Sequence, residues 1–136
     1  MDLKNFSLAT LAGAVVIFFL AFLFYEPILG SFFEAHGSNP NMREMPIMIL
    51  LVVASITWAG LYTLVFTRWA NISTFMGGLK AGAILGGLAG LSIDLEYYAL
   101  NSNVDFISTI VDVLVWVVRF GVAGGVIGWV LGRGKS

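Results

Sequence analysis

Four long apolar stretches constrain the fold of this chain more than any other feature of its sequence. They run from about Ser7 to Leu29, Pro46 to Phe66, Phe75 to Leu100 and Phe106 to Leu131. An α-helix needs roughly 20 mostly apolar residues to cross the hydrocarbon core of a bilayer, and each stretch is long enough. We therefore predict an all-α, four-helix transmembrane bundle that forms a single integral membrane domain over residues 1–136.

The overall composition agrees with this interpretation. Hydrophobic residues make up 59% of the chain and charged residues 11%, whereas about a quarter of the residues in a typical soluble domain are charged. A water-soluble fold of this size would lack the polar residues needed to cover its surface. We expect a multi-pass protein of the cell (inner) membrane, with the lipid bilayer as its first partner.

The chain lacks the residues that several classes of function require. The net charge is −1 without a Lys/Arg cluster, so nucleic-acid binding has no electrostatic basis. The chain has no cysteine and a single histidine, His36, which excludes thiolate sites and sites built from several histidines. Mg²⁺ and Ca²⁺ prefer oxygen ligands, but the acidic residues do not follow the spacing of a binding loop. Motifs of serine hydrolases, zinc proteases or phosphate-binding loops are missing too. We expect no enzyme activity, no cofactor and no metal site.

Polar segments separate the apolar stretches. Residues 31–45 read as a polar loop with glycine, proline and asparagine. Asn71, Ser73 and Thr74 are candidates to cap the third helix, and residues 102–105 are candidates to cap the fourth. The first stretch is too long for the apolar part of a secretory signal, and no small-residue cleavage site precedes the polar loop. We expect it to be a permanent helix.

Basic residues near the ends of the stretches predict the orientation of the bundle. Arg43 stands alone on one side. The other side carries Lys4, Arg68, Lys80, Arg133 and Lys135. Because Lys and Arg favour the cytoplasmic side, both termini are predicted to lie in the cytoplasm. The 31–45 loop and the 101–105 turn then face outward.

Glycine recurs at every fourth position in the last two stretches, a pattern known as a glycine zipper. The positions are Gly78, Gly82, Gly86 and Gly90 in the third stretch and Gly124, Gly128 and Gly132 in the fourth. Residues four apart share a helix face, and small residues on one face allow two helices to approach closely in lipid. We expect these faces to pack the third helix on the fourth, or to join two copies in a homo-oligomer.

Charged and aromatic side chains gather in the half of the predicted bundle that faces outward. The candidate ligand- or ion-binding residues are Glu26, Asp94, Glu96, Tyr97, Tyr98, Asp112, Trp116 and Arg119. A charged residue deep in a span costs at least ~2.5–3.5 kcal/mol on insertion scales, so it is expected to face the bundle interior, a water-filled cavity or another charge. The tyrosines, Tyr25 included, also fit an aromatic belt at the membrane interface.

Helical geometry distinguishes among these charges. Asp112 and Arg119 are seven residues apart on one helix face, about 10 Å along the axis. They are read either as a structural ion pair or as part of a binding or proton-relay site. Asp94 continues the glycine face, whereas Glu96 lies about 200° around the same helix. Glu26 and Glu96 also fit solvated positions at the membrane surface.

Two segments resemble a known family. IDLEYYALNSNVDF and IVDVLVW, in the second half of the chain, are similar to a bacterial family of small four-helix membrane proteins of unknown function. That family tends to end a glycine-rich third helix in an Asp-Leu pair, here Asp94 and Leu95. An Asp-x-x-Trp-like stretch follows in its fourth helix, here Asp112 to Trp116, with the tryptophan one place later than the pattern. FYEPILG in the first stretch is similar to an aromatic-Tyr-x-Pro element of a related uncharacterised family. The resemblance implies the four-helix architecture and deliberate positions for Asp94 and Asp112, and it implies no activity.

These observations predict a membrane binding or transport module. Its polar cavity would open to the outer side and hold a small ligand, a cation or a proton. The alternative is a non-catalytic accessory or structural subunit that docks through its glycine faces into a larger membrane complex. A hydrated outer cavity favours the first interpretation. A fully paired polar cluster beside an exposed small-residue face favours the second.

Overall fold

The computed structural model describes residues 2–37 and 43–133, and within these ranges the chain is helical and has no β-strand. The five α-helices are α1 (Leu3–Leu23), α2 (Gly30–Gly37), α3 (Met48–Val65), α4 (Phe75–Leu100) and α5 (Phe106–Arg133). One π-helical turn, Phe24–Ile28, extends α1, and another, Phe66–Ala70, extends α3. Four of the resulting helices are long and apolar enough to cross a membrane: Leu3–Ile28, Met48–Ala70, Phe75–Leu100 and Phe106–Arg133. The prediction of an all-helical chain with four helices able to cross a membrane is therefore confirmed.

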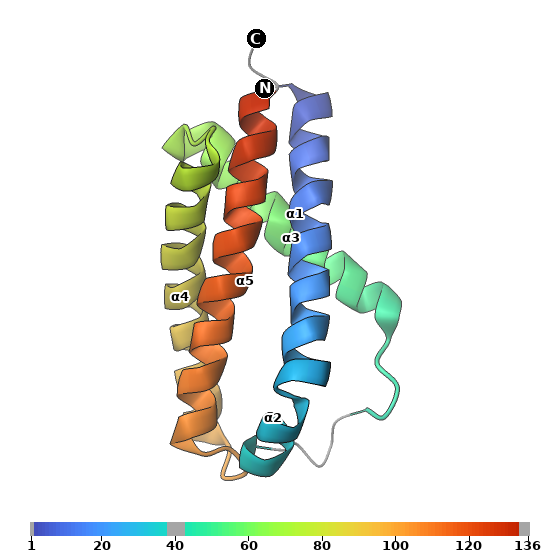
Figure 1. Cartoon of the computed structure of the whole chain (residues 1–136), viewed down its shortest axis with the longest axis vertical. Coiled ribbons are helices and arrows are strands. Elements are labelled where there is room, and N and C mark those ends of the chain that lie inside the picture. Colours follow the sequence, from blue (N-terminus) through green and yellow to red (C-terminus); the bar gives the residue numbers. More distant parts are fainter. Residues whose placement is uncertain (1, 38–42, 134–136) are drawn as a thin grey trace.

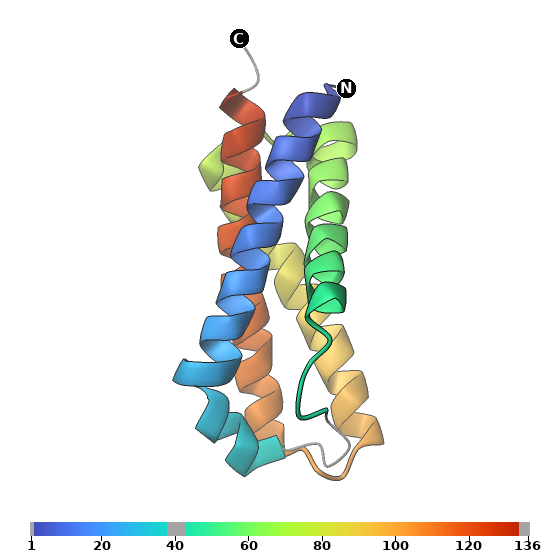
Figure 2. The same cartoon turned by 90° about the vertical axis from the view of Figure 1, so that its right-hand side faces the viewer.

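The long helices run up and down, so α1 begins and α5 ends at the same end of the bundle (Figure 1). Helix α5 packs along α4 on one side and along α1 on the other, while α3 packs mainly against α1. The perpendicular view shows α1 and α3 side by side (Figure 2). Helix α5 is therefore the central element, and α4 reaches the rest of the bundle chiefly through it.

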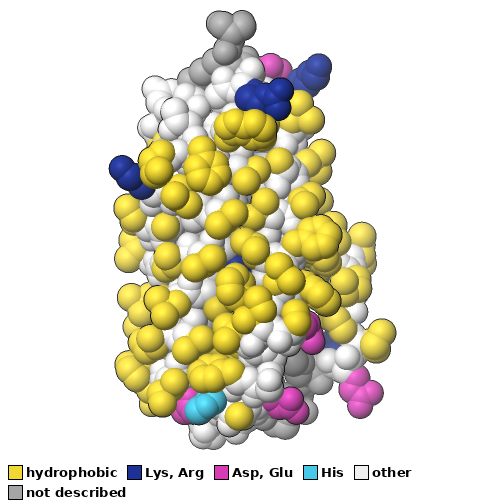
Figure 3. All heavy atoms as spheres, viewed as in Figure 1, with side chains coloured by type: hydrophobic (Ala, Val, Ile, Leu, Met, Phe, Trp, Pro, Cys, Tyr) yellow, Lys and Arg dark blue, Asp and Glu magenta, His cyan; other side chains and the backbone are white. Residues whose placement is uncertain are grey.

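Most basic side chains lie at one end of the bundle and most acidic ones at the other, with a largely apolar surface between them (Figure 3). The basic end, where α1 begins, carries Lys4, Arg68 and Arg133, all exposed. The opposite, acidic end carries Glu34, Glu44, Glu96 and Asp105. This arrangement suits a bundle whose middle lies in hydrocarbon and whose ends lie at two polar surfaces.

Side-chain caps mark where two of the spanning helices begin. The Thr74 hydroxyl accepts a hydrogen bond from the Gly77 backbone N–H at 3.0 Å, and the Asp105 carboxylate accepts one from the Ser108 N–H at 2.8 Å. Each bond satisfies one of the free N–H groups of a first helical turn. The predicted capping segments are confirmed at these two residues. Asn71 is not a cap of α4, because it adopts a left-handed conformation (φ 53°) that ends the preceding π-helical turn.

The expected loop over residues 31–45 is wrong in its first part, because α2 occupies Gly30–Gly37. Pro27 lies within the π-helical turn that ends the first span, and proline disrupts the regular hydrogen bonding of a helix. The chain turns there and starts a short helix whose Phe33 ring lies 5.5 Å from the ring of Tyr25. Residues 38–42 of the expected loop lie outside the described residues, as does Lys135 of the predicted basic side.

Glycines bring the backbones of α4 and α5 into direct contact. A Cβ atom added at Gly78 or Gly82 would overlap a backbone carbonyl oxygen of α5. One added at Gly124 or Gly128 would overlap a carbonyl oxygen at or just before the start of α4. Gly132 meets the carbonyl of Ser73 in the same way. The small-residue face of α4 therefore packs directly against the small-residue face of α5 within a single chain.

Farther toward the acidic end, the same contact admits aromatic rings instead. The Phe120 side chain fills the space beside Gly86, and the Trp116 ring fills the space beside Gly90. These two rings stack on each other with centroids 5.0 Å apart, and the Trp58 ring of α3 meets Phe120 at 5.2 Å. The buried core therefore lies between α1, α3 and α5, and its aromatic part reaches the glycine face of α4.

Candidate functional site

Four polar side chains from three segments meet inside the half of the bundle nearer the acidic end. This polar cluster consists of Tyr25 from the first π-helical turn, Asp94 from α4, and Asp112 and Arg119 from α5. All four side chains are partly buried. The structure thus brings together three of the predicted site residues. It adds Tyr25, which sequence reasoning had assigned to an interfacial belt.

Tyr25 holds Asp112 in place. The tyrosine hydroxyl donates a hydrogen bond to Oδ1 of Asp112. The two residues are 87 positions apart, so the bond joins the end of the first span to the half of α5 nearer the acidic end. Because Tyr25 lies in a π-helical turn, its direction around the helix differs from that in a regular α-helix. A regular helical projection of the sequence would therefore misplace it.

The carboxyl group of Asp94 lies near that of Asp112 across the contact between α4 and α5. Oδ2 of Asp94 is buried and lacks a hydrogen-bond partner among the described residues. Two ionised carboxylates are both acceptors, so neither can satisfy the other directly. A proton or a cation between the two groups would satisfy both oxygens.

Arg119 extends away from Asp112 toward α1. Its Nη2 atom donates to the backbone carbonyl of Ile17 at 3.3 Å. Its guanidinium carbon lies 5.7 Å from the ring centroid of Tyr25, 6.0 Å from that of Trp116 and 5.3 Å from that of Phe120. Aromatic faces attract a cation at about this distance. Arg119 is thus held by rings and a carbonyl, while its Nε lacks a hydrogen-bond partner in the described part of the chain.

Of the two interpretations of Asp112 and Arg119, the structural ion pair is not formed among the described residues. Within residues 2–37 and 43–133, the one pair at salt-bridge distance is His36 with Asp105. The two α5 residues are two helical turns apart, and their side chains follow different partners, Tyr25 for Asp112 and Ile17 for Arg119. They act on each other through space within one cluster and not through a shared hydrogen bond.

Charge is unequal within the polar cluster. Asp94 and Asp112 supply two acidic groups, and Arg119 supplies the one basic group among the four residues. Charges inside a membrane are costly unless they are paired or hydrated. The arginine can balance one carboxylate. The second carboxyl group has no basic partner among the four residues.

The remaining predicted site residues lie outside this cluster. Glu26, Glu96, Tyr97 and Tyr98 are all exposed on the surface of the bundle. The Tyr98 ring packs beside that of Phe106, at 5.8 Å between centroids. Trp116 is partly buried and borders the cluster through its contact with Arg119. The tyrosines keep positions suited to a membrane interface.

At the acidic end, α2 is fastened to the start of α5. Nδ1 of His36 lies 2.6 Å from Oδ2 of Asp105, and the Asp105 backbone N–H donates to the His36 carbonyl at 3.0 Å. The hydrogen bond from the Ser108 backbone N–H, and then that of His36, hold the pKa of Asp105 below its ordinary value. The two residues are 69 positions apart, and nothing in their local sequence signals the pairing.

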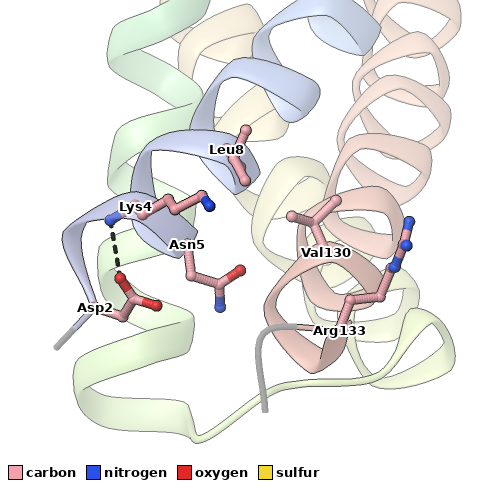
Figure 4. Close-up of a pocket in the computed structure, with 6 residues that line it drawn as sticks. All are labelled: Asp2, Lys4, Asn5, Leu8, Val130 and Arg133. Carbon is pink, nitrogen blue, oxygen red and sulfur yellow. Dashed lines mark hydrogen bonds between the residues drawn. The ribbon is translucent and has the colours of Figure 1, made fainter. Parts of the chain in front are cut away.

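Two cavities in the described part of the chain lie away from the cluster. One, of about 390 Å³, lies at the basic end between α1 and α5 (Figure 4). The other, of about 220 Å³, is an apolar groove between α1 and the first half of α3. The outward-facing polar cavity remains a prediction. In the described ranges, no three His, Cys, Asp or Glu side chains lie close enough together to hold a metal ion.

Comparison with known proteins identifies no relative of this chain. Neither a family model, nor a curated protein, nor a solved structure matches the chain. The resemblance to small four-helix membrane proteins of unknown function therefore stays a prediction. The structure itself shows four apolar helices that are long enough to cross a membrane. Between them lies the polar cluster, which has two acidic groups and one basic group.

Proposed function

We propose that this protein is an integral membrane binding or transport module that takes up a proton or a small cation between Asp94 and Asp112. The observation that carries the proposal is the neighbouring pair of carboxyl groups, which has Arg119 as its one basic partner in the cluster. Opposite charges stabilise each other strongly in a medium of low dielectric constant. An ion that neutralises the second carboxylate is therefore favoured at this position.

Each residue of the cluster has a role in this proposal. Tyr25 donates a hydrogen bond to Oδ1 of Asp112, and Asp94 lies beside the same carboxyl group. When Asp94 is protonated, it donates to Asp112. When it is ionised, the two carboxylates offer oxygen ligands to a cation. Arg119 keeps the cluster from carrying more than one uncompensated negative charge.

The packing of α4 on α5 supports access from the acidic end. Toward the basic end, glycines hold the two backbones in contact through Gly78, Gly82, Gly124 and Gly128. Close contact leaves no room for a hydrated path along this seam. At Gly86 and Gly90 the seam instead holds the Phe120 and Trp116 side chains, and Asp94 follows four residues after Gly90 on α4. An ion would therefore enter and leave through the acidic end, and transport would need the helices to separate on the basic side.

Orientation and localisation form a further part of the proposal. We propose an inner-membrane protein with both termini in the cytoplasm, because the basic end carries Lys4, Arg68 and Arg133. The polar cluster would then lie in the outer half of the bilayer. Self-association into a homo-oligomer, and membership of the family named above, belong to the same proposal.

The test is ion flux in sealed vesicles. The purified protein is reconstituted into liposomes that enclose a pH-sensitive dye, and a potassium diffusion potential drives proton entry. We expect flux above that of empty liposomes, lost in Asp94→Asn and in Asp112→Asn. Glu96→Gln is the matched control, because Glu96 lies two residues from Asp94 on the same helix and is exposed.

The outcomes separate the claims. If sodium, potassium and proton gradients all give the same rates as empty liposomes, transport is refuted. A binding role is then judged by infrared spectroscopy of the carboxyl groups. Loss of a protonated carboxyl band in Asp94→Asn, but not in Glu96→Gln, supports proton binding. A spectrum unchanged by either aspartate substitution, and by added cations, refutes the site.

One observation favours the alternative of an accessory subunit. All seven residues from Met48 to Ala54 are exposed, so the first two turns of α3 are only lightly covered by the rest of the described chain. A partner helix in a larger membrane complex would cover this segment. Blue native electrophoresis of gently solubilised membranes tests this role. A complex of higher mass that Val53→Lys dissolves, together with absent ion flux, would favour the accessory role.

A further inference from the structure

The larger cavity has no part in the function proposed above. It lies at the basic end, where α1 begins beside the last turn of α5, and its volume is about 390 Å³. Figure 4 shows its lining, which comprises Asp2, Lys4, Asn5, Leu8, Val130 and Arg133. The size falls within the range of about 300–1,000 Å³ that is typical of small-molecule pockets.

The polar lining of this cavity favours an anion. Lys4 and Arg133 approach it from two different helices, and neither has a carboxylate at salt-bridge distance within the described residues. Asp2 is the one acid in the lining, and its Oδ1 accepts a hydrogen bond from the Lys4 backbone N–H at 3.0 Å as the cap of α1. The Arg133 guanidinium turns to the side of α5 away from Lys4 (Figure 4), and its carbon lies 5.0 Å from the Trp129 ring centroid. It must rotate toward Lys4 to meet a shared ligand.

The cavity has a polar side and an apolar side. Asn5 points into the space between the helices, and its amide donates to the Leu131 carbonyl at 3.2 Å, which ties α1 to α5. Leu8 and Val130 form an apolar wall on the side away from the helix ends. Leu8 is 51% exposed. A phosphate in solution needs no apolar wall, whereas the glycerol and acyl carbons beside a lipid phosphate do.

Position in the fold points to the same ligand. The cavity opens at the end of two helices long enough to cross a membrane, which is the depth of lipid headgroups. Basic pockets between transmembrane helices bind anionic headgroups, and arginine matches the geometry of a phosphate through paired hydrogen bonds. We infer that this cavity binds an anionic phospholipid, with Lys4 and Arg133 on the phosphate and with Leu8 and Val130 against the carbons below it.

The probe is phosphatidylglycerol, with phosphatidylcholine as its zwitterionic competitor. The full chain is transferred to nanodiscs that contain both lipids, and native mass spectrometry counts the lipids retained after release. We expect one phosphatidylglycerol to be retained preferentially. Lys4→Gln and Arg133→Gln should each weaken retention about fivefold, and together about thirtyfold, as expected for about one basic contact each. Lys4→Arg and Arg133→Lys should keep it.

Two comparisons separate a built site from general attraction to the basic end. Arg68→Gln with Lys80→Gln removes two positive charges from the same half of the bundle, and neither residue lines the cavity. This variant should retain phosphatidylglycerol as the unchanged protein does. Asp2→Asn should tighten retention, because asparagine caps a helix as well as aspartate does and the one negative charge of the lining is lost.

Three results would overturn the inference. The first is equal loss of retention in the Arg68/Lys80 variant and the Lys4/Arg133 variant, which would indicate attraction to surface charge alone. The second is full retention in the Lys4/Arg133 variant. The third is displacement of the lipid by millimolar inorganic phosphate or glycerol phosphate, which would mark a site for a soluble phosphate. Thermal unfolding in detergent checks that each variant is folded.

Discussion

A single added methyl group at Gly82 should destabilise the bundle. A Cβ atom built there overlaps the Phe120 carbonyl oxygen and comes within 3.1 Å of the Gly124 Cα. Both neighbours are backbone atoms in the middle of a long helix, so neither can swing aside as a side chain would. Gly82→Ala therefore forces α4 and α5 apart along the contact that joins α4 to the rest of the chain.

The expected magnitude follows from two opposing effects. Alanine is a better helix former than glycine by about 1 kcal/mol. Overpacking a well-filled contact costs about 1–3 kcal/mol, and a rigid backbone neighbour favours the upper end of that range. The free energy of unfolding of Gly82→Ala should therefore fall by about 1–2 kcal/mol once the propensity gain is subtracted.

Gly60 provides the matched control, because it lies within α3 and a Cβ atom there meets only the Thr10 methyl group, at an ordinary 3.8 Å. Gly60→Ala should keep or raise stability by up to about 1 kcal/mol. Unfolding is followed by circular dichroism while a denaturing detergent is titrated into a mild one. The reasoning is refuted if Gly82→Ala is as stable as Gly60→Ala.

Three other predictions concern charge and topology. Arg119→Leu should cost about 3–5 kcal/mol by leaving buried carboxylates uncompensated, and adding Asp112→Leu should recover much of the loss; additive losses in thermal unfolding would show that the two charges are not coupled. Asp105 has a lowered pKa in the folded chain, so its contribution to stability is present above its ordinary pKa of about 3.9 and is lost as the pH falls through the lowered value. Asp105→Asn should therefore flatten the loss of stability on acidification in this range, and an unchanged acid profile would contradict this account. A fluorescent protein that folds only in the cytoplasm, fused after Ser136, should be bright, and a dark fusion at normal expression would reverse the proposed orientation.

Sequence patterns were sufficient for the elements whose causes are local. Length and hydropathy located the four spans within a few residues, since a bilayer requires long apolar helices. Thr74 was correct as a cap because a hydroxyl placed directly before a helix satisfies a free N–H group. Asp94 and Asp112 stood out because charge is rare and costly inside a span.

The missed features depend on how distant segments meet. The sequence predicts a loop where short helix α2 forms, because Phe33 contributes only when it packs beside Tyr25 of the preceding π-helical turn. Tyr25 itself was assigned to the interface, since the π-helical turn that aims it at Asp112 leaves no mark in hydropathy. The ion pair between Asp112 and Arg119 was one interpretation of their spacing on a helix. Spacing alone does not determine which neighbouring group each side chain contacts.

The central helix of this bundle follows all of its partners along the chain. During synthesis from the N-terminus, α1 and α3 can meet first, whereas the glycine face of α4 has nothing to cover it until α5 emerges. The hydrogen bond from Tyr25 to Asp112 likewise cannot form until α5 has been synthesised. Insertion of α5 therefore closes the helix contacts and completes the polar cluster in one late event. A nascent chain halted before Phe106 is a membrane-embedded intermediate with its small-residue face open, the form that membrane quality control would meet.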